Sequence, residues 1–238
     1  MLACLAVDLG TIGYSEAWAL QRQLHQARLA GQVGDVLLLL EHPHVYTAGR
    51  TGNLQHLLLP PHELARFGAT FEPTDRGGDL TYHGPGQLVG YPILDLRQYG
   101  QDVHRYLRLL EEVLIGVARD YGLAAQRLPG YTGVWVGDGK LAAIGVRISR
   151  WVTLHGFALN ISPDLGYFRH IVPCGIVGKA VTSLAEVVVP PPSRAEVLAS
   201  TIRHFGAVFQ CELRGLSPQA LRSMLIPRKE PYGQADLG

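Results

Sequence analysis

Hydrophobic positions along the chain follow two spacings, one typical of helices and one of strands. Apolar residues three or four positions apart predict one-sided helices, and short apolar runs between turn residues predict buried strands. Ser193 and Glu196 have the spacing of a capping box at the start of the last helix. The predicted helices cover residues 15–30, 60–67, 103–121 and 193–205. The predicted strands cover residues 2–9, 36–40, 45–47, 88–94, 133–136, 141–148, 152–159 and 208–213.

This order of elements predicts an α/β (α+β) fold with a mixed, largely antiparallel sheet and packed helices. The chain has 238 residues, of which 47% are hydrophobic, so it can bury one large core. We therefore expect a single domain over residues 1–213. Residues 214–238 carry no motif that we can assign, and we treat them as a C-terminal tail.

Charge and composition narrow the classes of partner. The formal net charge is +1 and charged residues make up 17% of the chain, which gives no strong field to attract nucleic acid or an anionic membrane. No apolar run approaches the roughly 20 residues that cross a bilayer. We expect a cytoplasmic protein that binds neither nucleic acid nor membrane.

Residues 76–87, RGGDLTYHGPGQ, form the most distinctive stretch of the sequence. Four glycines and a proline among twelve residues disfavour a regular helix or a central strand. Glycine also lets backbone N–H groups approach a ligand closely. We predict a rigid recognition loop that is held by the strand after it. The spacing matches neither a phosphate-binding loop nor a dinucleotide fingerprint.

One of the three cysteines is a candidate nucleophile. Cys4 and Cys211 lie in apolar strand-like segments and are expected to be buried core residues. Cys174 instead lies between Pro173 and Gly175, which predicts a turn or loop. Three cysteines do not make a disulfide framework.

A nucleophilic cysteine needs a group that favours its thiolate. Lowering a thiol pKa from about 8.5 to neutrality takes about 2 kcal/mol, and an ammonium about 4 Å away can supply on the order of 4 kcal/mol. Lys140 follows a Gly-Asp-Gly turn, and Lys179 and His170 lie within five positions of Cys174. Spacing alone does not choose among these three activators.

Four other histidines deserve an interpretation. His42 and His44 would share one face of a strand, but no cysteine pair or carboxylate accompanies them at ligand spacing, so we expect no metal ion. His83 and His155 are interpreted as hydrogen-bonding walls of a pocket or as satisfied buried histidines.

Taken together, these residues resemble the octanoyltransferase family, the lipoyl(octanoyl) transferases of lipoate biosynthesis, within the biotin/lipoate protein ligase superfamily. The resemblance covers roughly residues 41–184, with the motifs in the family's order. The motifs occupy residues 41–47, 76–87, 133–135, 140–147, 155–160 and 173–175.

The resemblance implies a fold like the catalytic domain of biotin and lipoate protein ligases. It implies transfer of octanoyl from octanoyl-acyl carrier protein, through a Cys174 thioester, to a lysine of a lipoyl domain, without a cofactor. The acceptors would be lipoyl domains of 2-oxoacid dehydrogenase E2 subunits and the glycine cleavage H protein. Lys140 would lower the pKa of Cys174, and the substrate-binding residues would be Arg76, Gly77, Gly78, Asp79, Leu80, Thr81, Tyr82, His83, Ala143, Ile144, Gly145, Gly156, Phe157 and Ala158.

Three alternatives remain. An ATP-dependent lipoate or octanoate ligase resembles this fold but has no nucleophilic cysteine. A binding module would recognise lipoyl domains or carrier proteins without turnover, and a cysteine hydrolase would release the free acid. For the acidic carrier protein, charge complementarity suggests docking on Arg147, Arg150 or Arg169.

Overall fold

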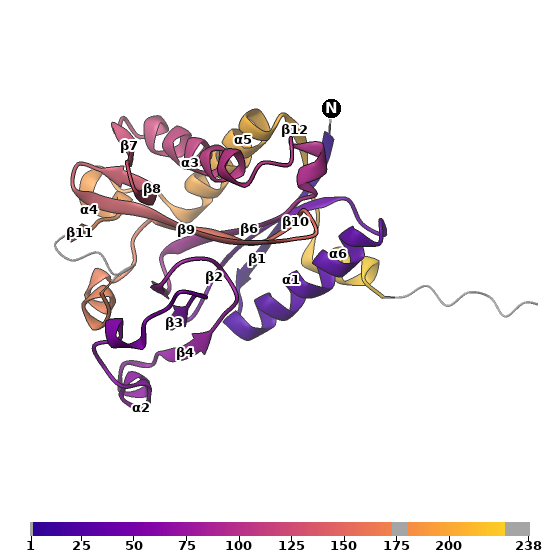
Figure 1. The fold of residues 1–238 in the computed structure, drawn as a ribbon. Helices are drawn as coiled ribbons and strands as arrows, with labels where there is room; N and C mark the ends of the chain where they lie inside the picture. The colour runs from indigo at the N-terminus through magenta and orange to yellow at the C-terminus, as the bar shows by residue number, and fades with distance from the viewer. Residues whose placement is uncertain (1, 173–179, 227–238) are drawn as a thin grey trace, which may run out of the picture.

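A computed structural model, which describes residues 2–172 and 180–226, has the mixed, largely antiparallel sheet that the sequence predicts (Figure 1). Its main sheet runs in the order β12-β1-β2-β6-β10-β9-β8-β7, and β11 pairs with β9. β1 is parallel to β2 and β12, whereas the pairs from β2 to β7 are antiparallel. The strands are β1 (Leu2–Thr11), β2 (Asp35–Glu41), β6 (Gln87–Ile93), β7 (Ala125–Leu128), β8 (Tyr131–Val136), β9 (Gly139–Ser149), β10 (Val152–Asn160), β11 (Ala180–Val181) and β12 (Cys211–Gly215).

Long helices cover both faces of this sheet (Figure 1). α1 (Tyr14–Leu29) packs on β6 and β10, and α3 (Val103–Asp120) and α5 (Arg194–Phe209) pack together on the opposite face. Within residues 2–172 and 180–226, no helix has the length and apolar character needed to cross a membrane. The short helices are α2 (Pro61–Leu64), α4 (Leu184–Val187), α6 (Pro218–Met224) and the 3-10 helices η1 (Leu54–His56), η2 (Ala65–Phe67), η3 (Leu96–Gln98) and η4 (Leu165–His170).

Strand β2 lies in the middle of the sheet, and its residues do not alternate between polar and apolar. Leu37 and Leu39 join the core under α3 and α5, whereas Leu38 and Leu40 join the core under α1. Successive side chains of a strand point to opposite faces, and both faces are covered. Every one of these positions is therefore apolar and fully buried.

A small second sheet corrects the prediction of one continuous loop over residues 76–87. Its order is β4-β3-β5, made of β3 (Val45–Ala48), β4 (Thr70–Pro73) and β5 (Leu80–His83). β5 takes the glycine-free centre of the run, where Leu80 and Tyr82 bury their side chains in a third core cluster. The prediction rested on the glycines of the run and did not use the alternation of the buried Leu80 and Tyr82 side chains. It therefore missed an edge strand.

The C-terminal part also differs from the prediction. α5 runs to Phe209, beyond the predicted end, because Phe205 and Phe209 stack four positions apart with ring centroids 4.3 Å from each other. The predicted strand therefore begins only at Cys211, which is buried, as expected. The capping box of Ser193 is confirmed. Farther on, α6 buries Leu221 in the core cluster under α1.

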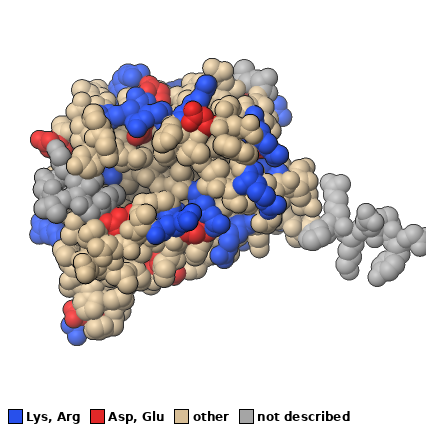
Figure 2. Space-filling model, in the orientation of Figure 1, with Lys and Arg blue, Asp and Glu red and all other residues tan. Residues whose placement is uncertain are grey.

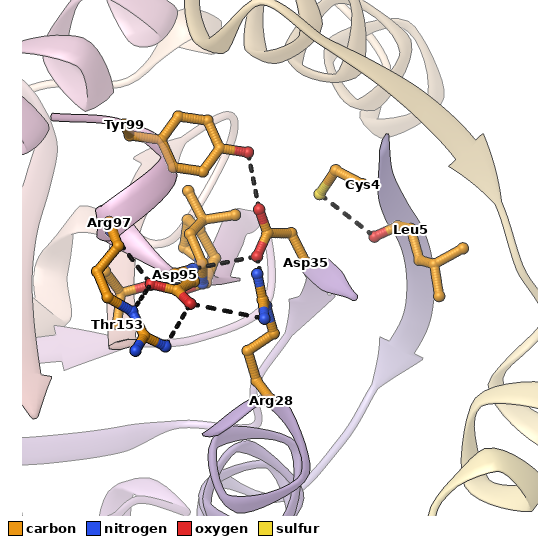
Figure 3. Close-up of polar contacts among 10 residues, drawn as sticks. Cys4, Leu5, Arg28, Asp35, Asp95, Arg97, Tyr99 and Thr153 are labelled. Carbon is orange, nitrogen blue, oxygen red and sulfur yellow. Dashed lines mark hydrogen bonds and ion pairs between the residues drawn. The ribbon is translucent and has the colours of Figure 1, made fainter. Parts of the chain in front are cut away.

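A buried polar network joins α1 to the sheet (Figure 3). Asp35 accepts hydrogen bonds from Arg28 Nε at 2.8 Å, from the Tyr99 hydroxyl at 2.8 Å and from the Asp95 backbone N–H at 3.1 Å. Arg97 pairs with Asp95 on the outer side. The network fixes the end of α1, the helix that carries part of the site described below.

Candidate functional site

The three segments that the sequence analysis assigned to substrate meet around one cavity. It lies between the small sheet, β9 and β10 and opens to solvent on one side. A second, smaller cavity adjoins it and shares the walls Thr81, Ala143 and Ala158. The first cavity is lined by Tyr14, Arg76, Gly77, Gly78, Asp79, Thr81, His83, Tyr91, Ala143, Ile144, Gly145, His155, Gly156, Phe157 and Ala158.

Two of the expected substrate-binding residues lie elsewhere. Tyr82 lines the second cavity, and Leu80 lies within the third core cluster. Tyr14 and Tyr91, which the sequence analysis did not select, line the first cavity. Each of these tyrosines follows the apolar spacing of its own element, so no local signal distinguishes it from a core residue.

The pairing of β9 with β10 shows how the two cavities are arranged along these strands. Ala143 faces Ala158 across the β9–β10 pair, and His155 lies opposite Val146. Lys140 and Asn160 line the second cavity, and His155 lines the first. Asn160 and His155 are five residues apart along β10, so the second and first cavities follow one another along this strand.

Lys140 lies at one end of this space, directly after the predicted hairpin turn. Its side chain is 8% exposed, and its Nζ lies 5.4 Å from the centre of the Trp135 ring. A Cβ at Gly133 would lie 2.8 Å from Lys140 Cε, so this glycine, with φ of +127°, leaves the room that the lysine occupies. The buried Glu111 accepts a 3.2 Å hydrogen bond from the Gly133 N–H and holds that backbone in place.

A chain of hydrogen bonds between amide groups, the amide relay, lies at the Lys140 end of the site. Gly84 N–H donates to Gln87 Oε1 at 3.2 Å, Gln87 Nε2 donates to Asn160 Oδ1 at 2.8 Å, and Asn160 Nδ2 donates to Thr182 O at 2.9 Å. The Thr182 N–H donates in turn to Lys140 O at 3.1 Å. Four segments distant in sequence are thereby fixed around Lys140.

Cys174 and Lys179 lie outside the described residues. The described chain on both sides lines the cavity of Lys140, through Phe168 before Cys174 and Val181 after it. Val181 also pairs with Lys140 in the β11–β9 ladder.

His170, one of the alternative activators, is held in an aromatic cluster. Its Nδ1 lies 2.8 Å from the Tyr46 hydroxyl, and its ring packs against Phe67 with centroids 4.5 Å apart. The same tyrosine hydroxyl donates to Tyr167 O at 2.8 Å. These contacts give His170 a structural role in anchoring η4.

The loop before β5 is anchored from two sides. Arg76 Nη2 donates to Thr47 O at 2.7 Å and to its Oγ1 at 2.9 Å. Asp75 accepts from His155 Nε2 at 2.7 Å and pairs with Arg147. Burial lowers the pKa of His155 and outweighs the opposing effect of Asp75, so the imidazole is neutral at pH 7.

His42 and His44 are held by hydrogen bonds to the protein. His42 Nδ1–H donates to Ile12 O, and the Tyr91 hydroxyl donates to His42 Nε2, both at 2.8 Å. Burial lowers the pKa of His42 to about 4. His44 Nδ1 lies 2.7 Å from the Tyr82 hydroxyl. Within the described parts of the chain, no three His, Cys, Asp or Glu side chains are grouped as a metal ion would require.

Comparison with known proteins gives the same family as the motifs. Residues 13–206 match the family model described as the lipoyl protein ligase A/B catalytic domain. An octanoyltransferase of Solibacter usitatus is 54% identical over 213 residues, which cover 90% of this chain and 96% of the relative. An octanoyltransferase of Gloeobacter violaceus is 48% identical over 225 residues, covering 93% and 96%.

Solved structures confirm the expected fold. A bipartite lipoate protein ligase of Thermoplasma acidophilum aligns with a TM-score of 0.71 at 16% identity, over 94% of this chain and 91% of that one. A biotin protein ligase of Aquifex aeolicus aligns with a TM-score of 0.50 at 12% identity, over 88% and 70%.

Proposed function

Because the chain belongs to the octanoyltransferase family, we propose that it transfers octanoyl from octanoyl-acyl carrier protein to a lysine of a lipoyl domain. The family makes it an acyltransferase of the lipoyl(octanoyl) transferase type. The proposed acceptors are lipoyl domains of 2-oxoacid dehydrogenase E2 subunits and the glycine cleavage H protein.

In the proposed reaction the acyl group passes through a thioester on Cys174. The Cys174 thiolate attacks the carrier thioester, and the Lys140 ammonium protonates the departing pantetheine thiolate. The acceptor lysine amine then attacks the Cys174 thioester. Lys140 takes the amine proton, the amide forms, and the Cys174 thiolate is released. Thioester-to-amide transfer is downhill, so this cycle needs no ATP.

The observation that best supports the proposal is the buried amine of Lys140 at one end of a mostly apolar cavity. The chain that flanks Cys174 on both sides lines the same space. Burying the seven methylene and methyl groups of an octanoyl chain contributes roughly 5 to 6 kcal/mol, enough to favour medium chains over short ones.

Intact-mass analysis after incubation with octanoyl-acyl carrier protein tests the covalent step. We expect one added octanoyl group that hydroxylamine removes and that is absent in Cys174→Ala. Cys211→Ala is a matched control, because this second cysteine is buried in β12, away from the cavity residues, and should still be labelled.

The alternatives give different products. Amide formation that requires ATP would indicate a ligase, and free octanoate without amide would indicate a hydrolase. Binding of both partners with no loss of activity in Cys174→Ala would overturn the thioester mechanism.

We propose that the carrier protein docks on exposed arginines. Figure 2 shows more Lys and Arg than Asp and Glu side chains on the face in view. Arg150 in the β9–β10 turn and Arg169 in η4 are exposed, whereas Arg147 is paired with Asp75. We expect Arg150→Gln and Arg169→Gln to raise the KM for the carrier protein, and added salt to do the same. A KM that is insensitive to salt would contradict this docking.

A further inference from the structure

Three buried polar side chains line the first cavity, which Lys140 does not line, and each has an atom without a hydrogen-bond partner. They are the Tyr14 hydroxyl, His83 Nδ1 and His155 Nδ1. Their residues are 5%, 7% and 1% exposed. Thr74 lies near the Tyr14 hydroxyl but outside hydrogen-bond geometry.

Two more atoms of this kind lie beside them on α1. Trp18 Nε1 and Gln21 Nε2 are also buried without a partner, and Gln21 Oε1 accepts from the His155 N–H at 2.7 Å. The rings of Tyr14 and His83 lie 6.1 Å apart, as do those of Trp18 and His155. Five of the seven such atoms in the described residues thus belong to one neighbourhood.

This concentration needs an explanation, because nearly all buried polar atoms in proteins find a partner. A lone orphaned atom can reflect local strain. Five in one neighbourhood, three of them on residues that line the cavity, indicate a place where a ligand or ordered water supplies the missing partners.

The neighbourhood is suited to a neutral group. Burial lowers the pKa of His83 and of His155, and burial raises the pKa of Tyr14 to about 12, so all three are uncharged at pH 7. The Arg76 guanidinium also lines the cavity, but it donates to Thr47 O and Oγ1. Uncharged donors and acceptors of this kind pair with a hydroxyl at little cost in desolvation.

We propose that the first cavity holds a subsite for a neutral hydrogen-bonding group near the far end of the acyl chain. The proposal depends on the proposed function, in which the thioester carbonyl lies near Lys140 and the chain extends toward Tyr14 and His155. The substrate class then includes medium-chain acyl thioesters with a terminal hydroxyl, such as 8-hydroxyoctanoyl.

The test compares kcat/KM for transfer of octanoyl and of 8-hydroxyoctanoyl from their pantetheine thioesters to a lipoyl domain. An apolar slot would penalise the buried hydroxyl by about tenfold or more, since 1.4 kcal/mol is one factor of ten and an unpaired hydroxyl costs about 1–3 kcal/mol. We expect the two substrates to agree within about threefold. A hydroxylated substrate that is more than about tenfold poorer would overturn the proposal.

Tyr14→Phe removes one hydroxyl and nothing else. We expect it to lower the ratio of the two kcat/KM values, hydroxylated over plain, by about tenfold. Tyr106→Phe is the matched control, because the Tyr106 hydroxyl is also buried without a partner but belongs to α3 and the core beneath it. Its ratio should not change. An unchanged ratio in Tyr14→Phe would refute the subsite, whereas failure to transfer octanoyl at all would refute the proposed function instead.

Discussion

The amide relay around Lys140 offers a sharp test of how the site is held. In Asn160→Ala, the Gln87 Nε2 donor and the Thr182 carbonyl both lose their partner while remaining buried. Each buried polar group left unpaired costs about 1–3 kcal/mol. We expect the free energy of unfolding to fall by about 2–6 kcal/mol, measured by urea denaturation with an unchanged m value.

The same change should slow octanoyl transfer, because Thr182 is hydrogen-bonded to the backbone of Lys140. A displacement of the order of 1 Å at a reacting group can cost about a hundredfold, and we expect a loss of kcat/KM of about ten- to a hundredfold. The loss should appear at temperatures where the variant is still fully folded.

A double-mutant cycle separates the relay from the individual side chains. Gln87→Ala and Asn160→Ala together should be less destabilising than the sum of the single changes, with a coupling of about 0.5–3 kcal/mol. Gln219→Ala, an exposed amide on α6, is the control and should change stability by no more than about 0.5 kcal/mol. Additive single effects, or an Asn160→Ala loss below about 0.5 kcal/mol, would refute the reasoning.

Three further changes test the chemistry and the core. Lys140→Arg should slow amide formation in single turnovers by at least about a hundredfold, because a guanidinium keeps its charge but does not exchange protons. The pKa of His42 is about 4 in the folded chain, against about 6.5 in the unfolded chain. Lowering the pH from 6.5 to 4 should therefore reduce the free energy of unfolding by about 3 kcal/mol. In His42→Phe, the free energy of unfolding measured with urea should fall by about 3 kcal/mol less over the same pH range. Asp35→Ala should cost about 3–5 kcal/mol in urea denaturation, because it leaves a buried arginine without its closest carboxylate.

Each of these has a contradicting outcome. Transfer by Lys140→Arg within tenfold of the original rate would remove proton exchange from the mechanism. A His42→Phe profile as steep as the original would assign the pH dependence to other groups. A stability loss in Asp35→Ala no larger than that of Glu212→Ala, whose ion pair with Arg214 is exposed, would contradict the assigned role of the buried network.

Much of the fold could be predicted because local and tertiary preferences agree. The run of residues 36–40 is apolar on both faces since helices cover both faces, and the capping box at Ser193 acts within one turn. The Gly-Asp-Gly turn likewise fixed where Lys140 enters its strand. In each case the decisive contacts lie within the element itself or follow from its periodicity.

The rest depended on partners far away in sequence. β5 forms because it pairs with β3, which lies more than thirty positions earlier in the chain. No feature of residues 76–87 indicates this pairing. Tyr14 reaches the cavity because of how α1 crosses β10, and its spacing is that of an ordinary core residue. The partner of Asn160, at position 87, follows from the antiparallel register of β10 and β6.

Strands β12 and β1, at one edge of the main sheet, affect how shorter fragments of the chain would behave when they are expressed. β1 and β12, paired in parallel from Leu2–Cys211 to Ala6–Gly215, both lie outside residues 13–206, the part that matches the family model. A fragment trimmed to that match would leave β2, with six of its seven residues buried in the intact chain, as an open edge. Such an edge recruits other strands, so the trimmed protein should aggregate even though every cavity residue is retained.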